Sequence, residues 1–149
     1  MRRTIADWIL IALSIVVLVA TGVYLIIAWG SIPDKIPTNF DFSGNVTSYG
    51  GKGNIIAAYV MDILVSVTLL LCAAFPKSWN VPGKAKNNPE TYIAVKYMLE
   101  GMALLLALFL GYLLYAMARL IVLKASVCIA FIALLAIGSI APFVISKLK

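Results

Sequence analysis

Four long runs of apolar residues constrain this chain more than any other feature of its sequence. They cover roughly residues 8–29, 55–75, 98–118 and 125–146. A helix of about 20 apolar residues is long enough to cross a ~30 Å hydrocarbon core. Lipid offers no hydrogen-bond partner to a free backbone group, so each run should be helical. The sequence therefore predicts an all-α integral membrane protein with four transmembrane helices, organised as a single domain over residues 1–149.

Composition supports a lipid environment and argues against several other classes. The chain is 63% hydrophobic and 12% charged, whereas a soluble domain carries about 25% charged residues. Its net charge of +6 does not indicate nucleic acid, because the Lys and Arg residues lie between the apolar runs and form no basic face. The sequence has no histidine and no HExxH, GxSxG or phosphate-loop motif. We therefore expect a non-enzymatic protein whose partner is the lipid bilayer, with no cofactor, metal or nucleic acid.

The positive charges predict the orientation of the helices. Positively charged residues collect in cytoplasmic loops, so the side with more of them should face the cytoplasm. With the N-terminus inside, eight of the twelve fall on the cytoplasmic side and four, Lys35, Lys52, Arg119 and Lys124, fall outside. Both termini are therefore expected in the cytoplasm of a multi-pass plasma-membrane protein, with a basic cytoplasmic loop over residues 76–97. Within that loop, Asn88 and Pro89 have the residue types of a helix cap and first turn.

The loop over residues 31–53 is expected on the outer side and has an unusual sequence for a mere connection. Pro33 and Pro37 restrict the backbone, and alternation after Pro37 should place Phe40 and Phe42 on one side of an extended arm. Gly44 marks a turn, so a short hairpin with a second arm near residues 45–49 is predicted, followed by a flexible glycine-rich return. Two interpretations stay open. The loop either folds down on the bilayer or forms a lid over the helices that binds something.

The loop also carries a family resemblance. Its stretch IPDKIPTNFDFSGNVTSYGGK resembles the signature LPDxIPxHFNxxGxxDxxGSK of the domain of unknown function 1648, with the spacing kept. The matching positions are Pro33, Asp34, Ile36, Pro37, Phe40, Gly44, Gly50 and Lys52. The sequence departs from the signature at Asn39, where the family has His, at Asp41, where it has Asn, and at Thr47, where it has Asp.

The resemblance implies a function class and a set of candidate residues. SdpI-type immunity proteins of bacteria carry this domain at their N-terminus, protect a producer cell from its own secreted toxin peptide and signal the presence of that toxin. The resemblance therefore implies a bacterial membrane protein that senses a peptide or confers immunity through its outer loop. The candidate residues for binding a peptide or another membrane protein are Pro33, Asp34, Pro37, Asn39, Phe40, Asp41, Gly44 and Lys52.

A polar group inside the second apolar run gives a different candidate. Asp62 lies one helical turn from both Tyr59 and Ser66, so the three share a face. A carboxylate within lipid costs roughly 2.5–3.5 kcal/mol, so Asp62 should face the other helices. It is a proton or cation site, an anchor for the outer loop through Lys52, or a structural hydrogen-bonding group.

Other polar residues in the runs are interpreted as packing or interfacial groups. Glu100 and Lys96 have the spacing of an interfacial ion pair on one helix. Asp7, Ser14 and Thr21 repeat every seven residues and predict a polar helix–helix contact. Two alternative functions remain beside peptide sensing: a small proton-coupled transporter, which would need a homodimer, and an accessory subunit of a membrane complex.

Overall fold

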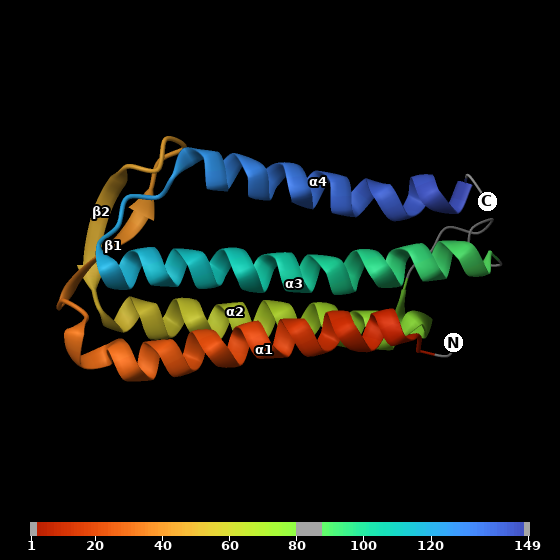
Figure 1. Cartoon of the computed structure of the whole chain (residues 1–149), viewed down its shortest axis with the longest axis horizontal. Helices are drawn as coiled ribbons and strands as arrows, with labels where there is room; N and C mark the ends of the chain where they lie inside the picture. Colours follow the sequence, from red (N-terminus) through yellow and green to blue (C-terminus); the bar gives the residue numbers. More distant parts are fainter. Residues whose placement is uncertain (1–2, 80–87, 148–149) are drawn as a thin grey trace.

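A computed structural model describes residues 3–79 and 88–147 of the chain. The elements in chain order are α1 (Ile5–Ala28), η1 (Trp29–Ser31), β1 (Lys35–Phe40), β2 (Val46–Gly51), α2 (Gly53–Ala74), η2 (Pro76–Ser78), α3 (Pro89–Arg119) and α4 (Ala125–Lys147). Figure 1 shows the helices α1 to α4 with their axes roughly aligned and the strands β1 and β2 across one end of the bundle, called here the hairpin end. Helix α1 begins, and helix α4 ends, at the opposite end, called here the far end.

The helices have the length and composition of membrane spans. Three segments, Ile5–Ser31, Gly53–Ala74 and Pro89–Arg119, are long and apolar enough to cross a bilayer, and Ala125–Ala141 of α4 is a shorter apolar stretch. Large apolar side chains such as Ile26, Val60 and Leu108 are exposed on the outer surface of the bundle, where lipid removes the cost of exposure. The chain is a membrane protein. The fourth span and the cytoplasmic position of the termini stay predictions.

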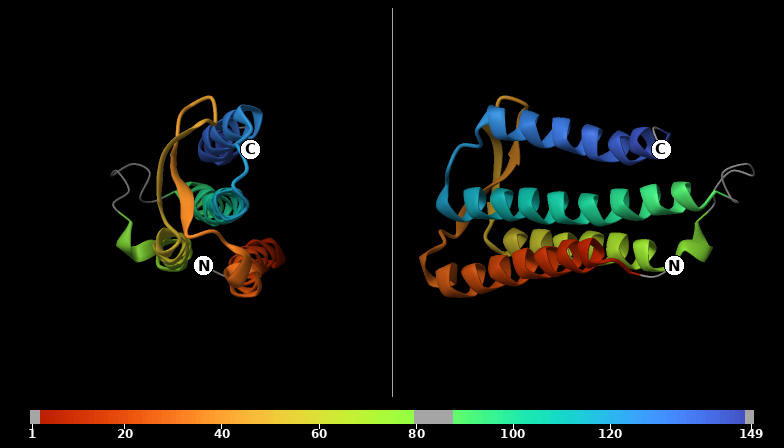
Figure 2. Two further views of the ribbon diagram at one scale, coloured as in Figure 1. Left: turned by 90° about the vertical axis from the view of Figure 1, so that its left-hand side faces the viewer. Right: turned by 45° about the vertical axis from the view of Figure 1, so that its right-hand side comes forward.

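Helix α3 is the central element of the bundle. It packs against α1, α2 and α4, whereas α4 packs mainly on α3 (Figure 2). Ala103 and Ala107 are fully buried on α3 and let the neighbouring helices approach closely. Phe109 of α3 stacks on Phe131 of α4 with ring centroids 3.9 Å apart, which joins the outlying helix to the bundle.

Helix α3 is longer than the apolar run that predicted it. It begins at Pro89, and the Asn88 side chain accepts a hydrogen bond from the Glu90 amide at 2.9 Å, as the cap prediction required. The predicted loop over residues 76–97 therefore ends in helix, because a proline in the first turn tolerates a polar start that hydropathy alone does not detect. Residues 80–87 of that loop lie outside the described residues.

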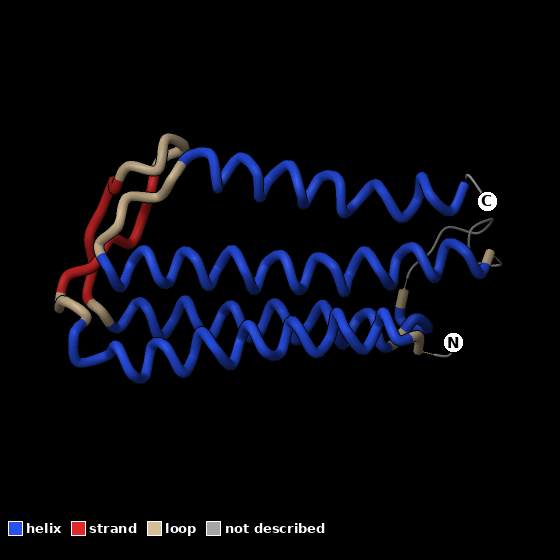
Figure 3. Tube along the Cα trace, in the orientation of Figure 1, coloured by secondary structure: helices blue, strands red, loops and turns tan. Residues whose placement is uncertain are grey.

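The fold is not purely α-helical, because strands β1 and β2 form an antiparallel hairpin (Figure 3). The predicted hairpin is present, but its second arm extends to Gly51, so Gly50 and Gly51 pair with Ile36 and Lys35 instead of forming a flexible return. Register shifts on either side of Asn39 break the simple alternation. Phe42 lies beyond β1 and is 98% exposed, so it does not share a buried face with Phe40 as predicted.

The hairpin is seated on the main apolar core of the molecule. Ile32 and Ile36 pack with Ile55 of α2 and with residues of α1 and α3, and Phe40 packs against the edge of the same cluster; the rest of its buried members are Leu25, Leu114, Met117 and Ala118. Burying an aliphatic side chain of this size is worth about 1.5–3 kcal/mol. The hairpin is thus held to the helices by its own apolar residues.

Candidate functional site

The two ends of the signature segment are joined at the base of the hairpin. Lys52 Nζ lies 3.3 Å from Asp34 Oδ1, and the Lys52 amide donates a hydrogen bond to the Asp34 carbonyl oxygen at 3.0 Å. Lys52 also lies over the Trp29 ring, 5.4 Å from its centroid. Lys52 therefore closes the hairpin. It does not pair with Asp62, so Asp62 does not anchor the outer loop through Lys52. The exposed ion pair itself adds little stability, typically below about 1 kcal/mol.

The Asp41 carboxylate organises the turn of the hairpin. Its Oδ1 accepts hydrogen bonds from the amides of Ser43 at 2.9 Å and Asn45 at 2.8 Å, and its Oδ2 accepts one from Asn45 Nδ2 at 3.2 Å. These bonds, led by the one from the Asn45 backbone, hold the pKa of Asp41 below its usual range because they favour the charged form. The carboxylate is engaged within the loop, so Asp41 shapes the site more than it offers a free acceptor.

Gly44 lets the turn lie against the connection between α3 and α4. Its φ is +87°, a value that L side chains rarely adopt, and a Cβ at this position would collide with the Leu123 carbonyl oxygen. Leu123 itself is buried. The signature glycine is therefore required both by the turn and by the contact that fixes the hairpin tip near α4.

A cavity of about 490 Å³ lies beneath the hairpin. Thr38, Asn39, Phe40 and Asp41 line it from the hairpin, and the helical residues that complete it are Asn54, Ala58, Phe109, Leu110, Leu113, Leu114, Met117, Leu123 and Cys128. Volumes of this order are typical of ligand pockets. Three of the eight candidate residues, Asn39, Phe40 and Asp41, thus meet at one cavity.

The cavity has an available polar group on Asn39 and an apolar extension. Asn39 Nδ2 donates to Ser48 Oγ at 2.7 Å, while no donor within residues 3–79 and 88–147 reaches Asn39 Oδ1. A second hollow of about 340 Å³ shares Phe40, Asp41 and Cys128 with the first, and extends along Phe42, Ile129 and Ile132 of the hairpin tip and α4. Together the two hollows, here called the hairpin groove, form an apolar path between the hairpin and α4.

The segment that builds the hairpin groove is also the part of the chain that a known family covers. Residues 16–62 match the family model of a domain of unknown function, DUF1648. The chain carries a DUF1648 domain. No curated protein and no solved structure matches the chain. The DUF1648 segment includes most of α1, the whole hairpin and α2 as far as Asp62, whereas the wall supplied by α3 and α4 lies outside it.

The remaining signature residues of the DUF1648 segment shape the hairpin and do not line the groove. Pro37 is fully buried in β1 opposite Tyr49, and Pro33 is exposed where the chain leaves η1. Asp34 and Lys52 lie at the hairpin base, away from the groove lining. The structure therefore divides the candidates into residues that shape the hairpin and residues that face the groove. Asp41 does both, because it lines the groove and holds the turn. Among the candidates, Asn39 and Phe40 face the groove and have no part in the turn.

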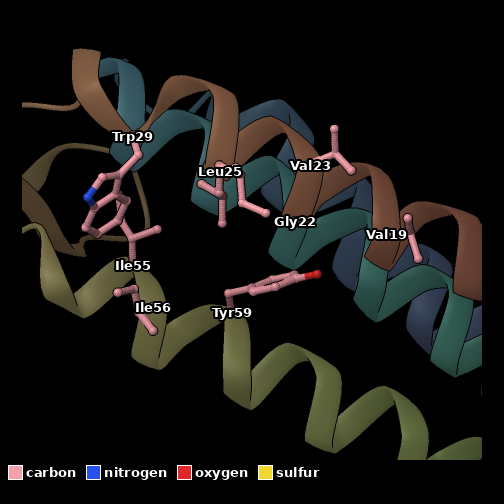
Figure 4. Close-up of a pocket in the computed structure, with 9 residues that line it drawn as sticks. Val19, Gly22, Val23, Leu25, Trp29, Ile55, Ile56 and Tyr59 are labelled. Atoms are coloured by element: carbon pink, nitrogen blue, oxygen red, sulfur yellow. The ribbon is translucent and has the colours of Figure 1, made fainter.

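A third hollow lies on another side of the DUF1648 segment, between α1 and α2. Figure 4 shows its lining, with the Tyr59 ring on one side and the apolar residues of α1 on the other. Its volume is about 560 Å³, and the Tyr59 hydroxyl donates to the Leu18 carbonyl oxygen at 2.8 Å. A Cβ at Gly22 would collide with this hydroxyl. Tyr59 therefore joins α1 to α2 and does not share a hydrogen bond with Asp62.

Asp62 is buried between the helices as predicted. It is fully buried, and Ser66 Oγ donates to its Oδ1 at 3.3 Å. No described residue donates to Asp62 Oδ2. Of the three grouped residues, the structure joins Asp62 with Ser66 and assigns Tyr59 to a different contact.

The prediction of an ion pair between Lys96 and Glu100 is wrong. Lys96 Nζ pairs instead with Asp7 Oδ2 of α1 at 2.7 Å, and both side chains are buried. Glu100 is 2% exposed. The spacing suggested a pair on one helix, but a tighter pair across two helices is formed because α1 brings an acid to the same depth. Asp7 and Ser14 are buried in the bundle as the seven-residue repeat predicted.

Proposed function

We propose that this protein is a non-enzymatic membrane protein that binds an apolar peptide segment in the hairpin groove and acts in peptide sensing or immunity. The observation that carries the proposal is the groove itself, which unites Asn39 and Phe40 of the DUF1648 segment with apolar walls from α3 and α4. An apolar peptide side chain fits such walls, and the free Asn39 Oδ1 can accept a hydrogen bond from a peptide amide. The hairpin is proposed to face the outside of a bacterial plasma membrane, where a secreted peptide would arrive.

Cys128 provides a direct readout of occupancy. It lines both parts of the hairpin groove, whereas Cys72, the other free cysteine, lies in the last turn of α2 at the far end. In a Cys72→Ser variant reconstituted in lipid nanodiscs, peptide bound in the groove should slow alkylation of Cys128. The probes are fractions of the peptides that the source cell secretes, followed by the most protective purified peptide.

The groove variants have distinct expected effects. Phe40→Ala should weaken peptide binding about 30-fold, since truncating an aromatic anchor costs about 2 kcal/mol. Asn39→Ala should weaken it about 3–10-fold, the loss of one hydrogen bond of roughly 1 kcal/mol. Tyr49→Ala is the matched control, because Tyr49 is exposed on β2 and lines neither hollow. Melting temperatures show whether each variant remains folded. Equal protection of Cys128 in wild type and in folded Phe40→Ala would contradict the proposal.

Proton-coupled transport is the second candidate function. It is favoured by one observation: the fully buried Asp62 has an oxygen, Oδ2, that receives no hydrogen bond from the described residues. A buried carboxyl in this position is neutral when it holds a proton. The difference between the infrared carboxylic acid bands of the wild-type and Asp62→Asn proteins reports whether Asp62 carries one.

A further inference from the structure

A cluster of buried ionisable groups lies toward the far end of the bundle, away from the hairpin groove. Asp7 of α1 and Lys96 and Glu100 of α3 form it, and each of the three is no more than 6% exposed. Lys96 Nζ donates to Asp7 Oδ2 at 2.7 Å. Glu100 follows Lys96 by one helical turn and interacts electrostatically with both Lys96 and Asp7. None of these residues lines the hairpin groove.

The charges of this cluster do not balance when both acids are ionised. Within the described residues, two carboxylates face a single buried ammonium, which leaves one uncompensated negative charge among apolar helices. Such a charge is expensive in a membrane, and charged groups there are found paired or neutralised. One additional proton makes the cluster neutral.

Two carboxylate oxygens are available for that proton. Within the described parts of the chain, no donor reaches Asp7 Oδ1 or Glu100 Oε2, although both residues are buried. A buried acceptor that lacks a donor is destabilising, because it has lost its hydrogen bonds to water without replacement. Protonating one carboxyl turns it into a donor and the other remains an acceptor, so one proton satisfies both oxygens.

The surrounding groups that the structure describes do not remove the imbalance. On α3, Lys96 lies over the Tyr97 ring, and the Tyr97 hydroxyl is hydrogen-bonded to Thr4 Oγ1 at 2.8 Å. Arg3 also faces Glu100 electrostatically, but it is exposed and lies over the Trp8 ring, so water and ions screen its charge.

We propose that Asp7 and Glu100 form a proton-binding site, in which one exchangeable proton is shared between the two carboxyls beside Lys96. The step is a simple protonation, in which a carboxylate and a proton become a carboxylic acid with no change in oxidation state. The site is separate from peptide binding in the hairpin groove and from Asp62. It gives the membrane-embedded bundle a group whose charge follows the pH.

Infrared spectroscopy tests this proposal directly, because only a protonated carboxyl shows the carboxylic acid carbonyl stretch. The protein is reconstituted in lipid nanodiscs in an Asp62→Asn background, which removes the other buried carboxyl of the bundle. We expect an acid band at neutral pH that shifts in D₂O. Glu100→Gln should abolish it, since Asp7 then pairs with Lys96 as an ion.

Lys96→Met provides an independent readout of the charge balance. Without the ammonium, both acids need a proton for neutrality, so the acid band should grow about two-fold. Helical circular dichroism and a monodisperse elution profile show that each variant is folded. Absence of the band in the Asp62→Asn protein at every pH at which it stays folded would overturn the proposal. So would a band that survives Glu100→Gln, or one that does not grow in Lys96→Met.

Discussion

Gly44 is required to be glycine both by the local backbone conformation and by tertiary packing. Its positive φ belongs to the turn of the hairpin, and its missing side chain makes room for the Leu123 carbonyl oxygen. The Asp41 carboxylate holds the same turn from the other side through the amides of Ser43 and Asn45. One glycine and one carboxylate thus fix where the hairpin tip lies, and with it one wall of the hairpin groove.

Gly44→Ala should therefore detach the hairpin tip from the α3–α4 connection. The strain of a positive φ and the collision with Leu123 together should cost about 2–4 kcal/mol of folding free energy. Thermal unfolding in detergent and hydrogen exchange of the hairpin amides measure the effect. Gly30→Ala is the matched control, since nothing lies within 4 Å of a Cβ at Gly30. Equal hairpin protection in the two variants would show that the contact with Leu123 is not needed.

At the scale of elements, α1 and α3 are joined by different chemistry at their two ends. At the hairpin end, Arg119 Nε donates to the Tyr24 hydroxyl at 3.2 Å, and Tyr24 packs against Tyr115. Toward the far end the joint is the buried Asp7–Lys96 pair with Glu100 beside it. Breaking a buried pair is costly because it strands a charge, whereas exchanging one acid for another beside the same ammonium is not.

Substitution of the two acids should therefore be strongly non-additive. Asp7→Asn and Glu100→Gln should each cost about 1 kcal/mol or less, because the remaining carboxylate pairs with Lys96. The double variant should lose about 3–5 kcal/mol, since it leaves the ammonium buried and alone. Unfolding of the reconstituted protein by denaturant measures this coupling.

The triple variant that adds Lys96→Met is the control for this cycle, because it removes the stranded charge and should recover most of the loss. Additive effects of Asp7→Asn and Glu100→Gln would mean that Lys96 cannot turn from one acid to the other.

At the scale of the whole molecule, the arrangement is a helical bundle closed at one end by a docked hairpin (Figure 1). The α3 helix contacts the other three helices, so it links the hairpin groove at one end with the Asp7–Glu100 cluster toward the other. The two cysteines report on these ends separately. Cys128 lies in the first turn of α4 near the hairpin, and Cys72 in the last turn of α2.

The orientation of the whole molecule can be read from these cysteines. If the hairpin faces outward, a membrane-impermeant maleimide should label Cys128 in intact cells, and should label Cys72 only after the membrane is permeabilised. Cys72→Ser and Cys128→Ser assign each signal. Labelling of Cys72 alone in intact cells would reverse the predicted orientation, and would place the hairpin groove in the cytoplasm.

Much of the hairpin could be predicted from the sequence because its determinants are local. Pro37 and Gly44 restrict the backbone within a few residues, and the DUF1648 signature marks the same segment. The register shifts beside Asn39 could not be predicted in this way, because simple alternation assumes a regular ladder. The same holds for Phe42, whose alternation with Phe40 ends where β1 ends.

The sequence by itself determined that the helices of this protein lie in lipid, because runs of about 20 apolar residues leave no alternative. It also determined the helices and the turn of the hairpin, which depend on neighbouring residues. Tertiary structure alone decided the partners of the polar groups. Lys96 lies one turn from Glu100 yet pairs with Asp7, 89 residues away, and Cys128 lines a groove built by a segment that precedes it by two helices. Such pairings depend on the depth and rotation of packed helices, which no local pattern records.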